Sequence, residues 1–128
     1  LERFGGGPVC LRMLSSFRSG RWYQRRILLV DERSGHPVEM GAVRINLDAF
    51  KPDIRAEILR HDAPLGRLLR TGGIDFESRP RGFLALTPNS EMMGLFWMTE
   101  PLTLYGRQTD VLIDGKKAGD IVEILPLV

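Results

Sequence analysis

Asp114-Gly115 separates two stretches near the end of this chain, residues 102–113 (LTLYGRQTDVLI) and residues 118–125 (AGDIVEIL). An Asp-Gly pair between two such stretches is a strong signal for a tight hairpin turn. Within the second stretch, residues 121–125 (IVEIL) carry one carboxylate, Glu123, among apolar residues. These residues therefore predict an antiparallel β-hairpin whose return strand carries Glu123 among apolar residues.

The upstream half of the chain predicts further strands. Residues 22–31 (WYQRRILLVD) end in a continuous apolar run, which is typical of a strand. Ser34-Gly35-His36-Pro37 has the composition of a turn, and residues 38–45 alternate in part, as expected of a hairpin partner. Gly41 interrupts that partner strand; such a glycine marks either a close approach of a ligand to the backbone or a packing constraint.

The middle of the chain predicts helices. Pro52 suits the first turn of one helix, and Pro64 that of a second, which the glycines at 72 and 73 end. Residues 9–14, 74–77 and 83–86 predict short strands, and residues 88–90 a turn. We therefore expect residues 1–128 to form a single α+β domain. Its antiparallel β-sheet should have a few helices inserted between the N-terminal and C-terminal strands.

Composition excludes several classes of function. The net charge is +2, and the arginines are scattered rather than gathered in a basic stripe, so we expect no nucleic-acid binding by this domain. No apolar run approaches the roughly 20 residues that cross a bilayer, and no leader opens the chain, so we expect no membrane partner and a cytoplasmic location. Cys10, His36 and His61 lack the spacing of metal ligands, so we expect no metal and no cofactor.

Two charged residues stand within apolar strands, Arg25 and Glu123. Each either faces water or is buried for a purpose, and a buried charge needs a partner. The apolar segment Met92-Met93-Gly94-Leu95-Phe96-Trp97-Met98 leaves three interpretations open: a lid over a pocket, a contact surface or ordinary core.

Several islands of this sequence, taken in order, resemble the chorismate pyruvate-lyase family. They are Gln24-Arg25-Arg26-Ile27-Leu28-Leu29, the turn at 34–37 with the later Gly41, Ala63-Pro64-Leu65-Gly66-Arg67-Leu68-Leu69, Leu104-Tyr105-Gly106-Arg107, and the Asp114-Gly115 hairpin with its late Glu123. The resemblance spans roughly residues 4–126 and is unclear over residues 91–101. It implies a chorismate lyase-like fold and a lyase that eliminates pyruvate from chorismate to give 4-hydroxybenzoate, a step of ubiquinone biosynthesis, without a metal or organic cofactor.

The same resemblance implies a site. Arg25 would pair with the ring carboxylate of the substrate, and the backbone N–H of Leu65 would bind the same group. Glu123 would hydrogen-bond the ring hydroxyl and assist proton movement, so Arg25 and Glu123 are the expected catalytic residues. Gly41 and Arg107 complete the expected substrate-binding set. We therefore expect Arg25 and Glu123 to face one enclosed cavity.

An alternative function comes with the same fold. It also serves as the effector domain of some bacterial transcription regulators, which would make this chain a non-catalytic binder of a small molecule. Such regulators carry a winged helix-turn-helix domain upstream, and none is visible in these residues, so lyase activity is the preferred interpretation. Both alternatives imply a small aromatic acid or chorismate as the partner. No pattern sets an oligomeric state.

Overall fold

The computed structural model describes residues 3–4, 7–60 and 63–126, so His61 lies outside the described residues. Within them, seven strands form one sheet in the order β1-β2-β3-β4-β7-β6-β5, and every neighbouring pair is antiparallel. The strands are β1 (Arg3–Phe4), β2 (Gly7–Ser19), β3 (Trp22–Asp31), β4 (Pro37–Asn46), β5 (Glu77–Leu86), β6 (Leu104–Ile113) and β7 (Lys116–Leu125).

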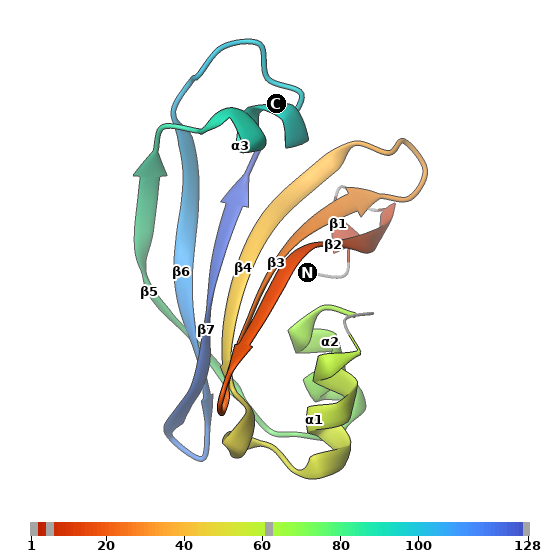
Figure 1. The fold of residues 1–128 in the computed structure, drawn as a ribbon, viewed down its shortest axis with the longest axis vertical. Coiled ribbons are helices and arrows are strands. Elements are labelled where there is room, and N and C mark those ends of the chain that lie inside the picture. The colour runs from red at the N-terminus through yellow and green to blue at the C-terminus, as the bar shows by residue number, and fades with distance from the viewer. Residues whose placement is uncertain (1–2, 5–6, 61–62, 127–128) are drawn as a thin grey trace.

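The helices lie between the N-terminal and C-terminal strands. A 3-10 turn, η1 (Leu47–Ala49), precedes α1 (Pro52–Leu59) and α2 (Leu65–Thr71), and α3 (Ser90–Leu95) joins β5 to β6. Figure 1 shows α1 and α2 side by side near one end of the sheet and α3 near the other end. The predicted α+β architecture is confirmed. No helix among the described residues is both long enough and apolar enough to span a bilayer.

The β6–β7 hairpin forms as predicted. Asp114 and Gly115 both have positive φ, 52° and 75°, which a tight type I′ turn requires of its two central residues. β7 then pairs with β4, which joins the C-terminal hairpin to the first strands of the chain. This pairing sets Gly41 opposite Glu123, while the hairpin sets Arg107 on the other side of the same residue.

Each face of the sheet is covered by different helices. Residues directly opposite one another in an antiparallel pair point to the same face. One face, here called the α1–α2 face, packs Tyr23, Val43 and Ile45 against Ile58 of α1 and Leu69 of α2. The reverse face packs other strand residues against α3; these include Leu28, Met40, Leu104 and Ile124, with Met92 and Phe96.

Two local predictions are wrong. β5 is one continuous strand that starts at Glu77, so residues 74–76 lie outside it. It tolerates Pro80 because β5 is the edge of the sheet and its register shifts between Pro80 and Gly82. The turn expected at residues 88–90 instead begins α3, because the Asn89 side chain accepts a hydrogen bond from the Met92 N–H over 2.9 Å.

Met92 and Phe96 are buried, so the core interpretation of their segment is confirmed for these two side chains. Their helix packs on the reverse face, where Arg26 of β3 forms two hydrogen bonds of 2.7 Å with Glu91.

Candidate functional site

Glu123 and Arg107 form a cross-strand ion pair on the α1–α2 face. They are register partners on β7 and β6, and Arg107 Nε donates to Glu123 Oε1 over 3.1 Å. The Glu123 side chain is mostly buried, while half of the Arg107 side chain is exposed. The carboxylate within the apolar strand therefore faces inward, and its partner arginine reaches toward solvent.

A second carboxyl group, Glu39 on β4, lies beside this pair. It is 4% exposed, and it reaches the same face because it lies two residues before Gly41, the register partner of Glu123. The pKa of Glu39 is raised to about 9, chiefly by burial and also by a hydrogen bond with the neighbouring Glu123 carboxyl and by its charge, while Arg107 opposes the shift. Glu39 is therefore protonated at neutral pH. Its Oε1 has no hydrogen-bond partner in the described part of the chain.

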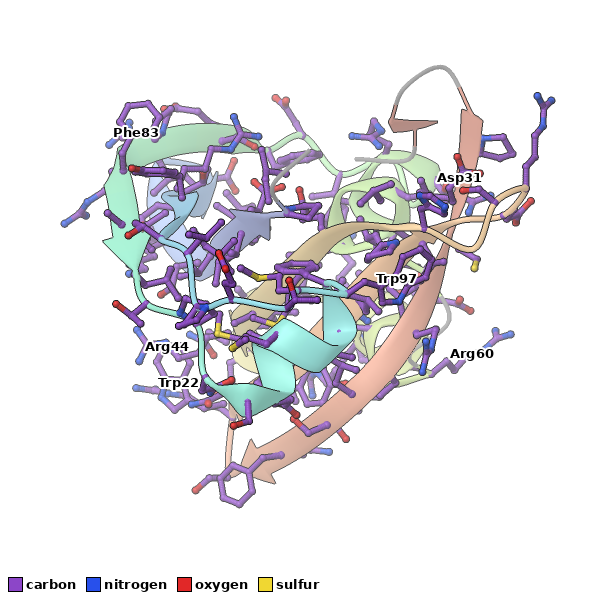
Figure 2. The ribbon with its side chains drawn as sticks, turned by 90° about the horizontal axis from the view of Figure 1, so that it is seen from above. Trp22, Asp31, Arg44, Arg60, Phe83 and Trp97 are labelled. Atoms are coloured by element: carbon purple, nitrogen blue, oxygen red, sulfur yellow. The ribbon has the colours of Figure 1, made fainter. Side chains whose placement is uncertain are left out.

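Two cavities open beside Arg107 and Glu123, and the larger one also includes Glu39 in its wall. The larger, about 370 Å³, is lined by Glu39, Phe83, Tyr105, Gly106, Arg107, Glu123 and Leu125. Its aromatic walls are open to solvent, since Phe83 is 91% exposed, and Figure 2 shows Phe83 at the outer edge of the sheet. An open cavity of this size, with apolar walls and a few polar groups, suits a small organic ligand.

The smaller cavity, about 240 Å³, lies between the sheet and α2. Leu65, Gly66 and Arg70 of α2 contribute to its wall, and it shares Arg107 and Glu123 with the larger cavity. Leu65 is the first residue of α2, where a backbone N–H has no partner within the helix. The expected contact through Leu65 therefore lies at the border of this cavity.

Arg25 reaches the same face but not these cavities. Its register partner Val43 pairs with Ile121, two residues before Glu123, so Arg25 and Glu123 share a face. Arg25 is 1% exposed, lines neither of the two cavities among the described residues, and donates from Nη2 to the Ala63 carbonyl over 2.8 Å. Burial raises the pKa of Tyr23, and the adjacent Arg25 opposes this shift. In this conformation Arg25 holds the segment that leads into α2.

Gly41 lies on β4, directly opposite Ile27 of β3. A Cβ atom at Gly41 would lie 3.3 Å from the Ile27 side chain, and Gly41 does not line either cavity. The packing explanation offered by the sequence therefore accounts for this glycine. Gly106 has the stricter requirement, because a Cβ there would overlap the Glu123 carbonyl.

Sequence reasoning missed Glu39, Phe83, Tyr105 and Arg70. The partial alternation in residues 38–45 correctly placed Glu39 on the other face of its strand from Val38 and Met40. It did not reveal that this face is buried too. The useful signal was the two-residue spacing of Glu39 and Gly41, because residues two apart on a strand share a face. The spacing places Glu39 on the face of Glu123 only once β4 is known to pair with β7, where Gly41 is the register partner of Glu123. No group of three His, Cys, Asp or Glu that could hold a metal occurs among residues 3–4, 7–60 and 63–126.

Comparison with known proteins identifies the fold of this chain but no family. No protein-family model and no curated protein matches this sequence. Solved structures do match. PhnF from Mycobacterium smegmatis superposes with a TM-score of 0.66 at 15% identity, over 93% of this chain and 58% of that one. This chain thus spans less than two thirds of the PhnF chain.

Two further structures agree. A GntR-family transcriptional regulator from Bacillus cereus superposes with a TM-score of 0.65 at 13% identity, covering 91% of this chain and 90% of that one. The C-terminal domain of the histidine utilization repressor from Pseudomonas syringae gives 0.60 at 12% identity, with 92% and 91% covered. The fold is therefore chorismate lyase-like, the form found in the C-terminal domains of GntR-family regulators.

Proposed function

We propose that this chain is a non-catalytic domain that binds a small organic acid as an effector, in the manner of GntR-family regulators, rather than a chorismate lyase. The observation that carries the proposal is the group Glu39, Glu123 and Arg107 at the base of a 370 Å³ cavity. Solved structures similar to this chain support it, since they include a GntR-family transcriptional regulator and the C-terminal domain of a repressor.

The contacts of the two expected catalytic residues also favour binding over catalysis. Arg25 is occupied with the Ala63 carbonyl, away from the cavities. Catalysis depends on holding the reacting group in one geometry, and a buried arginine that holds a loop does not reach a ligand in these cavities. The Glu123 side chain is likewise engaged, in a cross-strand ion pair with Arg107.

The ligand would be recognised by charge and by apolar contact. The exposed part of Arg107 can form a charge-assisted hydrogen bond with a carboxylate. Phe83 and Tyr105 offer aromatic surface for a ring. A small aromatic acid can contact Arg107 and both aromatic side chains.

Within a longer regulator, such a domain would report ligand binding to a second domain. A ligand changes the balance of two conformations only through a difference in its affinity for them. The segment at Ala63, held by Arg25 and leading into the α2 wall of the smaller cavity, is the element that we propose responds to the ligand.

A thermal-shift experiment with 4-hydroxybenzoate tests the proposal. A ligand that binds only the native state raises stability by RT ln(1 + [L]/Kd), about 2.7 kcal/mol at a hundredfold excess over Kd. We expect the Tm to rise for the wild type and for Arg79→Met, a control outside both cavities, and to stay unchanged for Arg107→Met. Chorismate should release no pyruvate; sustained release by the wild type would establish the lyase instead.

A further inference from the structure

The binding of an acid does not explain why a carboxyl group, Glu39, is buried at the wall of this cavity. It is almost fully buried, it lines the larger cavity, and one of its oxygens has no hydrogen-bond partner within the described residues. Burying a carboxyl group with an unsatisfied oxygen costs free energy, roughly 1–3 kcal/mol. A group at a cavity surface with such an unmet requirement is suited to a ligand that can donate to it.

The charges around the two cavities are arranged with opposite signs at opposite ends. Within the part of the chain that the structure describes, four charged residues line them: Glu39, Arg70, Arg107 and Glu123. Both glutamates border the larger cavity, and Arg70 borders only the smaller one beside α2. Arg107 and Glu123 stand at the junction that the two cavities share. A ligand that crosses this junction therefore meets the Glu39 carboxyl at one end and the Arg70 guanidinium at the other, with the Arg107–Glu123 pair between them.

We propose, building on the proposed function, that the ligand of this site is a small zwitterion. Its cationic nitrogen group binds between Glu39 and Glu123 in the larger cavity, and its acid group binds on the side of Arg107 and Arg70. A cation placed beside two carboxylates in a partly buried site gains more Coulomb energy than it would in water. The exposed faces of Phe83 and Tyr105 add a cation–π contribution on the same side.

Proton balance gives this proposal a distinctive consequence. Glu39 carries a proton in the empty site, and an ammonium group bound to it stabilises the carboxylate form. The ammonium keeps its own proton, and the proton of Glu39 passes to the buffer. Binding of a zwitterion near pH 7 therefore releases about one proton, whereas binding of the acid alone releases none. The other titratable side chains that line the larger cavity, among the described residues, are Tyr105, Arg107 and Glu123.

A matched set of benzoates tests the proposal by isothermal titration. The probes are 4-(aminomethyl)benzoate, 4-methylbenzoate, 4-(hydroxymethyl)benzoate and 4-methylbenzylamine, which share one shape and differ in charge. We expect 4-(aminomethyl)benzoate to bind about tenfold or more tightly than 4-methylbenzoate, the range measured for close charge pairs in binding sites. Repeating the titration in buffers of different ionisation enthalpy should detect the released proton.

The variant Glu39→Gln has the shape of the protonated side chain but cannot become an anion. In this variant the advantage of the ammonium probe should fall to about twofold or less and the proton release should disappear, because no carboxylate forms at position 39. Glu91→Gln, a carboxyl-to-amide change on the reverse face, should keep both the advantage and the proton release.

The outcomes separate this inference from the function on which it rests. Equal Kd values for 4-(aminomethyl)benzoate and 4-methylbenzoate in the wild type would overturn the zwitterion and leave acid binding in place. An ammonium advantage that survives in Glu39→Gln would overturn the assignment to Glu39. If none of the four probes binds at millimolar concentration, both the inference and the proposed function are contradicted.

Discussion

Arg107 and Glu123 face each other across neighbouring strands, and the arginine Nε donates to the glutamate Oε1 over 3.1 Å. This pair stands where two cavities meet, and both cavities include both side chains in their walls. The pair holds the mostly buried Glu123 side chain beside Glu39, whose pKa is raised chiefly by burial and also by its neighbour Glu123.

The pH dependence of stability should report the buried proton of Glu39. Its pKa in the folded state, about 9, lies above the ordinary value of 4.5, so its contribution to stability is complete below pH 4.5 and is lost as the pH rises toward 9. The Glu39→Gln variant should therefore gain stability relative to wild type between these pH values, by up to about 1.4 kcal/mol per pH unit. Urea denaturation of both proteins at several pH values measures this difference. A difference that does not vary with pH would show that Glu39 titrates normally.

The adjacent arginines of β3 should differ sharply in their effect on stability. Arg25 is buried and donates to the Ala63 carbonyl, so Arg25→Ala should cost roughly 3 kcal/mol of unfolding free energy. Arg26 forms an exposed ion pair with Glu91, so Arg26→Ala should cost less than about 1 kcal/mol. Chemical denaturation gives both values. Equal costs would contradict the structural role assigned to Arg25.

Glycine at position 106 should be required for the strand pairing that holds Glu123. A Cβ atom there would overlap the Glu123 carbonyl, so Gly106→Ala should destabilise the fold by about 1–3 kcal/mol, the usual cost of overpacking. The control is Gly82→Ala on β5, where an added Cβ meets nothing within 4 Å. The melting temperatures of the two variants should differ clearly, and a Gly106→Ala variant as stable as wild type would contradict the close approach.

The elements that sequence predicted well are those fixed by local chemistry. The Asp114-Gly115 turn could be predicted because both of its residues tolerate positive φ, and Pro52 and Pro64 mark where α1 and α2 begin. α3 was missed because its start depends on one side-chain cap, from Asn89, over only six residues. β5 was split because a proline within a strand is acceptable only at an edge, and strand order is a tertiary property.

The candidate site was predicted only in part, because some of its residues come together only through tertiary structure. Glu123 and Arg107 stood out as charges next to apolar residues or a glycine, and the structure brings them together. Glu39 and Glu123 lie far apart in the sequence and become neighbours only through the β4–β7 pairing. Arg25 could be assigned to a face but not to a partner, because its contact with Ala63 depends on how the loop before α2 packs.

The most direct test of the binding site is an NMR titration of the ¹⁵N-labelled protein with 4-hydroxybenzoate. We predict saturable changes in chemical shift for the backbone amides of Arg107 and Glu123 and for those of Leu65 and Gly66, which line the two cavities. The amides of α3, on the reverse face, should stay in place. Changes confined to α3, or none at millimolar ligand, would contradict a small-acid site at the Glu39, Glu123 and Arg107 group.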